Sequence, residues 1–147
     1  MRKGFGSIVL DVAFRHLAPF MILYAVYVLV HGHYGPGGGF QAGAMLGLAL
    51  CLVQLVQGHD AKPKWGLGMT AGLVLACVGA LIYVGIGLAA FVWSGNFLDY
   101  GVLPIAAIPA EARALGILGI ESGVTLGVMG VIFVIFDLLT RDKGQGA

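Results

Sequence analysis

Four long stretches of apolar residues, separated by short polar segments, dominate the chain. A helix that crosses a bilayer needs about 20 predominantly apolar residues. Stretches of this kind run over residues 12–30, 40–56, 66–92 and 115–139, the second being short for a span and the third long enough to tilt. The pattern predicts an all-α integral membrane protein with four transmembrane helices, forming a single membrane domain over residues 1–147.

The positive charges of the connecting segments predict the orientation of these helices. Lysine and arginine concentrate in cytoplasmic segments of membrane proteins. Only Arg113 lies on one side of the predicted spans, and seven basic residues lie on the other: Arg2, Lys3, Arg15, Lys62, Lys64, Arg141 and Lys143. Both termini are therefore predicted to be cytoplasmic, which agrees with the requirement that an even number of spans places both termini on the same side. The protein is expected to be a multi-pass protein of the cell membrane.

Composition narrows the range of functions. Hydrophobic residues make up 59% of the 147 residues and charged residues 10%, far below the ~25% typical of soluble domains. The net charge of +1, with no basic patch, argues against nucleic-acid binding. Cys51 and Cys77 lie in apolar stretches and are predicted to be buried, inert thiols. No catalytic set or nucleotide-binding motif is visible, so neither an enzyme nor a cofactor is predicted.

Glycines recur at helical spacing on three of the predicted spans. Small residues three or four positions apart let helices approach closely inside a membrane. The rows comprise Gly39, Gly43 and Gly47; Gly68, Gly72 and Gly79; and Gly119, Gly123, Gly127 and Gly130. Packing among the four helices is expected to account for most of this pattern. Because nearly every span has such a face, further helices from partner subunits are also expected.

The segment from His31 to Gln41, HGHYGPGGGFQ, is the most unusual in the chain. Pro36 lacks an amide donor, and Gly37, Gly38 and Gly39 before Phe40 permit positive φ. Two interpretations stay open: an irregular entry into the second span at membrane depth, or a tight turn at the membrane surface. The spacing of His31 and His33 does not suit a metal site, so no metal is predicted, and hydrogen bonding or proton transfer is favoured.

Glu121 is the most informative single residue. It lies about six residues, or ~9 Å, inside the fourth predicted span, where ionisable groups are rare and are functional candidates by default. Helical geometry places Thr125 on the same face, with the glycine row roughly opposite. The alternative is a structural hydrogen bond or ion pair. Two other pairs at i, i+4 spacing are interpreted as interfacial anchors: Asp137 with Arg141, and Asp11 with Arg15.

The run from Pro19 to Leu50 closely resembles the MnhB (also called MrpB) family of proteins found in multi-subunit Na⁺/H⁺ antiporters. The likeness rests on His31, Gly32, His33, Pro36, Gly37, Gly38, Gly39, Phe40 and Gln41, and on a later segment with Gly119, Ile120, Glu121, Gly123, Val124, Leu126 and Val128. The Pro-Gly-Gly-Gly-Phe element together with the membrane glutamate makes it fairly specific.

This resemblance implies an accessory membrane subunit that assembles with large antiporter-like subunits and other small ones, and that binds no redox cofactor. It would help form a path for Na⁺ or H⁺. The candidate path residues are Glu121, His31, His33, Gln41 and Thr125. The alternative is a structural subunit of a membrane-bound hydrogenase-type or related redox-driven complex. A free-standing transporter or channel is a weaker third hypothesis.

Overall fold

The structure, a computed structural model, describes residues 8–32, 38–57, 68–105 and 108–141. It contains four long helices, α1 (Ile8–His31), α2 (Gly39–Gln57), α3 (Met69–Val92) and α4 (Pro109–Arg141), and one short 3₁₀ helix, η1 (Tyr100–Val102). All four long helices have the length and apolar composition needed to cross a bilayer. The predicted all-α fold with four membrane-capable helices is confirmed.

The helix ends differ from the predicted spans in ways that have a physical reason. α4 begins at Pro109, six residues before the predicted start, because proline is well suited to the first turn of a helix. α1 likewise begins at Ile8, before the predicted Val12. Apolar length alone locates the part of a helix suited to lipid, whereas α4 continues into the more polar residues 109–114.

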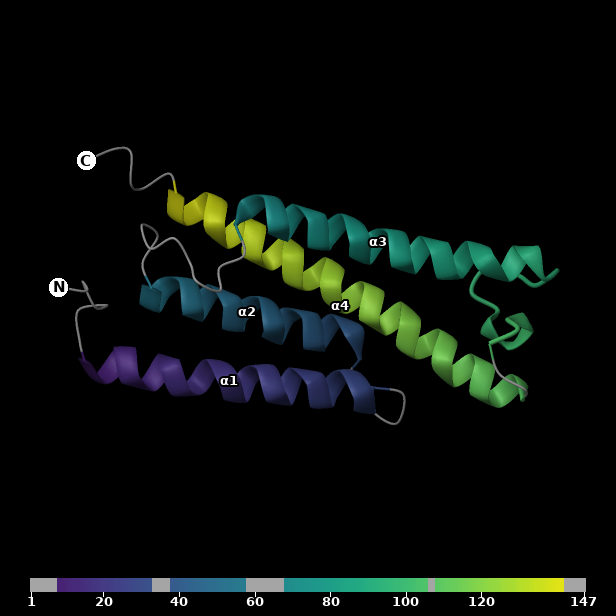
Figure 1. The fold of residues 1–147 in the computed structure, drawn as a ribbon, viewed down its shortest axis with the longest axis horizontal. Helices are drawn as coiled ribbons and strands as arrows, with labels where there is room; N and C mark the ends of the chain where they lie inside the picture. The colour runs from purple at the N-terminus through teal and green to yellow at the C-terminus, as the bar shows by residue number, and fades with distance from the viewer. Residues whose placement is uncertain (1–7, 33–37, 58–67, 106–107, 142–147) are drawn as a thin grey trace.

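The four helices lie side by side as a row, in the order α1, α2, α4, α3 (Figure 1). α4 packs against α2 on one side and α3 on the other, while α1 packs mainly against α2. Among the described residues no large side chain is fully buried, and several buried positions are alanines: Ala18, Ala25, Ala42, Ala49, Ala90 and Ala112. The row therefore leaves large apolar side chains exposed on every long helix, as expected where lipid or other helices cover them.

Glycines make the two seams of α4 unusually close. A β-carbon built on Gly79 of α3 would lie 2.5 Å from the carbonyl oxygen of Gly123, and one built on Gly130 would lie 2.5 Å from that of Gly72. On the other side of α4, a β-carbon on Gly43 of α2 would lie 2.7 Å from the carbonyl oxygen of Thr125. These contacts are possible only because both backbones meet without intervening side chains.

The glycine rows therefore pack largely within the chain. This agrees with the expectation that packing among the four helices accounts for most of the pattern, and the further helices expected from partner subunits stay a prediction. Helical periodicity identifies a face that needs a close neighbour. It does not say whether that neighbour belongs to the same chain.

The α1–α2 hairpin is shorter than the α3–α4 pair at one end of the row (Figure 1). α2 begins beside Glu121, whereas α3 passes this level near Tyr83, whose amide nitrogen would lie 3.1 Å from a β-carbon on Gly123. From Tyr83 to Val92, α3 continues for about 14 Å at 1.5 Å per residue. The end of α1 and the start of α2 thus lie well short of the η1 end of α3 and α4.

The segment between α3 and α4 folds against the first turns of α4. A β-carbon built on Gly116 would lie 2.6 Å from the ring of Tyr100. One built on Gly101 would lie 2.8 Å from the guanidinium group of Arg113. Burial raises the pKa of the Tyr100 phenol above its ordinary value, and the nearby Tyr83 phenol raises it further. Tyr100 is therefore a neutral packing group at neutral pH, and η1 covers the end of the α3–α4 seam.

Candidate functional site

Glu121 lies where the end of α1, the start of α2 and the middle of α4 meet. A β-carbon built on Gly38 would lie 2.6 Å from its Oε1, and one built on Gly32 would lie 2.9 Å from its Oε2. The carboxyl group therefore touches the backbone on both sides of the α1–α2 connection. The same β-carbon on Gly32 would lie 2.5 Å from the Cα of Gly38, so the two ends of the connection also cross each other closely.

The glycines next to this carboxyl group are required by conformation as well as by space. Gly38 has φ +98°, which L-residues with a side chain rarely adopt, and this confirms the expected use of positive φ in the glycine segment. Gly39 packs on the backbone of Glu121 itself. α2 therefore starts directly on α4, and a side chain at either position would push the two helices apart.

Thr125 holds this junction together one turn further along α4. Its side chain is only 3% exposed. The hydroxyl lies 3.0 Å from the carbonyl oxygen of Gly39 and 2.7 Å from that of Glu121, and can donate to either. A hydroxyl bonded to the carbonyl four residues earlier is common in membrane helices. The additional contact with Gly39 ties the first residue of α2 to the helix that carries Glu121.

The electrostatics of the junction favour an acid at this position. Oε2 of Glu121 is buried and has no hydrogen-bond partner among the described residues. The carboxyl group lies beside Gly38 and Gly39, at the N-terminal end of the 19-residue helix α2. The first amide groups and the dipole of a helix stabilise negative charge at this end. The site can therefore hold a carboxylate without an arginine or lysine bonded to it.

The other predicted path residues are distributed around this junction. The ring of His31 stacks on that of Tyr27 with 4.9 Å between centroids. The next residue, Gly32, touches the Glu121 carboxyl group with its backbone. Gln41 and Phe40 lie exposed on the first turn of α2. His33, Pro36 and Gly37 fall outside the described residues, so their predicted roles remain predictions.

A second polar contact joins α2 and α4 near the other end of their seam. Asp137 is 8% exposed, and its Oδ1 accepts a hydrogen bond of 2.7 Å from Nε2 of Gln54. The sequence predicted an interfacial anchor with Arg141, which stays a prediction because the Arg141 side chain lies outside the described residues; the carboxylate itself is buried against α2. Oε1 of Gln54 is itself buried without a partner in the described part of the chain. A polar side chain near the end of an otherwise apolar span was the available signal.

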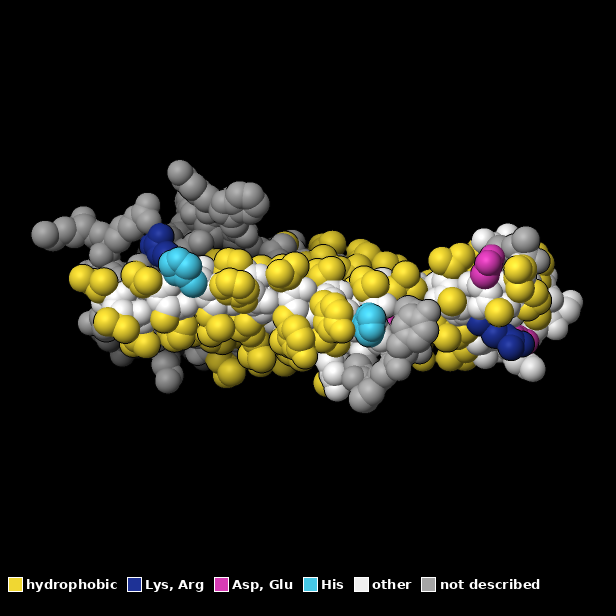
Figure 2. Space-filling view, turned by 90° about the horizontal axis from the view of Figure 1, so that it is seen from below, with side chains coloured by type: hydrophobic (Ala, Val, Ile, Leu, Met, Phe, Trp, Pro, Cys, Tyr) yellow, Lys and Arg dark blue, Asp and Glu magenta, His cyan; other side chains and the backbone are white. Residues whose placement is uncertain are grey.

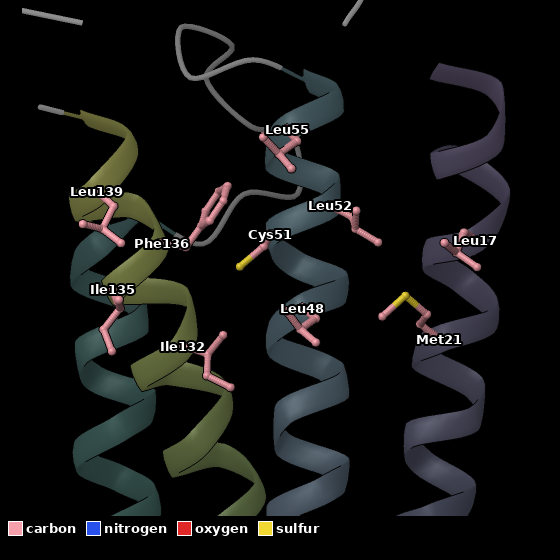
Figure 3. A pocket seen from close by; sticks show the side chains of 10 residues that line it. All are labelled: Leu17, Met21, Leu48, Cys51, Leu52, Leu55, Ile132, Ile135, Phe136 and Leu139. Atoms are coloured by element: carbon pink, nitrogen blue, oxygen red, sulfur yellow. The ribbon is translucent and has the colours of Figure 1, made fainter. Parts of the chain in front are cut away.

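Neither the cysteines nor an apolar groove between the helices suggests a metal or ion site. Within the described ranges no three His, Cys, Asp or Glu side chains come together to hold a metal. Cys51 is buried, but Cys77 is exposed on α3, which corrects the expectation that both thiols are buried. A groove of about 620 Å³ lies between α1 and α4 over α2 and is lined only by apolar side chains and Cys51 (Figure 3).

These features define a multi-pass membrane protein whose most distinctive site is an acid enclosed by glycine backbone. Residues 9–134 match a family model described as a domain related to the MnhB subunit of Na⁺/H⁺ antiporter. The chain belongs to this MnhB family.

Two relatives illustrate the range of the family. The chain is 28% identical to a Na⁺/H⁺ antiporter subunit of Bacillus subtilis (strain 168), covering 94% of this chain and 96% of the relative. It is also 29% identical to an uncharacterized protein of Methanocaldococcus jannaschii, over 84% of this chain and 48% of that protein. The chain therefore matches the Bacillus protein nearly end to end and spans about half of the archaeal one.

Proposed function

We propose that this chain is an accessory subunit of a multi-subunit Na⁺/H⁺ antiporter in the cell membrane, and that Glu121 exchanges protons on the translocation path. The observation that carries the proposal is the buried, unpartnered Oε2 of Glu121, enclosed by the ends of α1 and α2 in the described part of the chain. The family and the name of the Bacillus relative support the antiporter context over a redox-driven complex.

The spacing of charges along α4 supports a position of Glu121 at membrane depth. From Arg113 to Asp137 the helix rises about 36 Å, slightly more than the ~30 Å hydrocarbon core of a bilayer. Glu121 is the one ionisable residue between these two, about 12 Å from the level of Arg113. The α1–α2 connection meets Glu121, which favours an irregular entry at membrane depth over a turn at the membrane surface.

Such a site suits transient protonation. A carboxylate at depth is costly unless it is neutral, paired or hydrated, so an acid without a fixed cationic partner changes its proton occupancy with its surroundings. The N-terminal end of α2 stabilises the charged form, and water or a group from another subunit can supply the proton. Thr125 positions the junction, and His31 at the end of α1 and Gln41 on the first turn of α2 supply hydrogen-bonding groups near it, while His33 stays a candidate from the sequence. Na⁺ and H⁺ are the transported ions of this proposal.

Substitution of Glu121 within the assembled complex tests the proposal. Glu121→Gln keeps size and hydrogen bonding but cannot release a proton, so cation-dependent proton movement in membrane vesicles should fall about a hundredfold, the usual contribution of a positioned proton-transfer group. Glu121→Asp should retain part of the activity, because the acid remains on a shorter arm. Co-purification of the other subunits should be unchanged in both variants.

Glu111→Gln provides a matched control, since Glu111 lies exposed in the first turn of the same helix. It should transport as the parent does. Normal transport by an assembled Glu121→Gln complex would show that Glu121 is structural and would remove it from the path. Co-purification with hydrogenase or iron–sulfur subunits would instead identify the redox-driven alternative.

A further inference from the structure

The outward face of α1 carries a short ladder of polar aromatic side chains. Tyr24 stacks on Tyr27 with 6.1 Å between ring centroids, and Tyr27 stacks on His31 with 4.9 Å. Both tyrosines are 55% exposed, and neither phenol has a hydrogen-bond partner among the described residues. The surrounding face, at the edge of the row, is largely hydrophobic (Figure 2).

The ladder lies far from the level at which aromatic residues usually meet a membrane surface. Gly32 touches Glu121, which fixes the end of α1 at the level of that residue. Counting back along α1 places Tyr27 about 8 Å and Tyr24 about 12 Å further from the level of Arg113. They are then about 20 and 24 Å from Arg113, near the middle of the ~36 Å between Arg113 and Asp137.

Lipid is a poor neighbour for this surface. Interfacial tyrosines place the ring in the apolar region and the hydroxyl among headgroups and water. The two phenols, near the centre of the bilayer, have no such access. Lipid chains offer no hydrogen-bond partner, so exposure there is unfavourable. A protein surface with hydrogen-bonding groups at the same depth resolves this problem, because polar side chains join helices within membranes.

We propose that the ladder of Tyr24, Tyr27 and His31 is the docking surface for a transmembrane helix of another subunit, one that presents a carboxylate or amide side chain near the membrane centre. Positions 24, 27 and 31 form a stripe along one side of α1, and the stacked rings hold their polar atoms in a fixed row. Phenol groups donate well to carboxylate or amide oxygens. This inference rests on the proposed function, in that it places the chain in a multi-subunit complex.

Site-specific photocrosslinking in the native membrane tests the surface. A benzophenone amino acid at Tyr24 or Tyr27 should crosslink to one other membrane subunit of the complex. The same probe at Leu81, which is 71% exposed on α3 at the opposite edge of the row, should not give that product. A product of two copies of this chain, or crosslinks to lipid alone, would overturn the proposal.

Removal of the hydroxyls tests the chemistry of the contact. The double variant Tyr24→Phe/Tyr27→Phe keeps the rings, so two lost interhelical hydrogen bonds should weaken association with the crosslinked subunit about five- to tenfold. Tyr83→Phe on α3 should leave it unchanged. Association as strong as the parent's in the double variant would contradict the proposal.

The two proposals fail independently in these experiments. Crosslinking reports contact in the assembled complex whether or not Glu121 carries protons. If Glu121→Gln transports normally while Tyr27 crosslinks as expected, the proton path fails and the docking surface stands. If Glu121→Gln abolishes transport and no subunit is crosslinked at Tyr24 or Tyr27, the docking surface fails and the proton path stands.

Discussion

At the scale of single residues, the contact between Gly38 and Glu121 combines two constraints. The positive φ of Gly38 excludes most side chains by backbone conformation, and the carboxyl group of Glu121 occupies the place of a β-carbon. Either constraint alone would favour glycine. Together they make the backbone at Gly38, just before α2, depend on an acid that lies 83 residues later in the chain.

Substitution of Gly38 should therefore be severe. Gly38→Val places a β-branched residue at φ +98° and drives its Cβ into Oε1 of Glu121, which should cost at least about 2 kcal/mol of stability. The expected result is loss of assembly or of transport, measured by co-purification and by proton movement in vesicles. Gly85→Val is the control, because a β-carbon on Gly85 meets nothing within 4 Å. Equal behaviour of the two variants would mean that the segment is an ordinary turn.

The sequence predicts some of this junction and not the rest. Periodicity along α4 places Glu121 and Thr125 on one face and the glycines opposite, and the structure agrees: the first pair meets α2 and the glycines meet α3. Periodicity cannot predict that Gly38 contacts Glu121, because such a contact depends on the register between distant helices. The burial of Asp137 against Gln54 escaped prediction for the same reason.

At the scale of helices, positions within one seam differ in how much space they leave for a side chain. In the α3–α4 seam, Gly79 lies directly against the backbone of Gly123 and Gly127, whereas a β-carbon on Gly127 has nothing nearer than the carbonyl oxygen of Ala76, 4.0 Å away. Gly79 and Gly127 both belong to the glycine rows of the sequence, but they differ in the space beside them. Only one of them is required for the approach of the two helices.

This difference gives a sharp test of the α3–α4 seam. Gly79→Ala forces the two backbones apart and should lower stability by about 1–3 kcal/mol, as overpacking usually does. Gly127→Ala should change stability by no more than about 0.5 kcal/mol, since added alanine favours the helix and meets open space. Thermal unfolding of the purified complex in detergent compares the two. Similar losses in both variants would show that the helices pack in another register.

At the scale of the whole molecule, the row of helices explains why a chain of this kind acts within an assembly. In the described part of the row the buried apolar residues are mostly alanines and no large side chain is fully buried, and the edge helix α1 packs mainly against α2. The sequence predicted four spans but could not predict a row, because hydropathy reports which residues avoid water and not which helices touch. From composition alone, an exposed apolar face can contact either lipid or a partner helix. A polar group on that face, such as the Tyr27 phenol, favours a partner helix over lipid.

The orientation of the row is a prediction that loop charge makes for the whole molecule. The connection between α2 and α3 carries Lys62 and Lys64, whereas the connection between α3 and α4 carries no basic residue before Arg113. The first should therefore face the cytoplasm and the second the outside. In a chain with Cys51 and Cys77 replaced by alanine, a single cysteine at Asn96 should react with a membrane-impermeant thiol reagent on intact cells.

A single cysteine at Asp60 should react only after the cells are opened. Asn96 is exposed in the connection between α3 and α4, so access of the reagent is not limited by packing there. Labelling at Asp60 and protection at Asn96 would reverse the orientation and place Glu121 nearer the cytoplasmic side. Labelling of both positions on intact cells would mean that α3 does not cross the membrane. The orientation then decides from which side protons reach Glu121, since α1 ends and α2 begins toward the same end of the row as η1 (Figure 1).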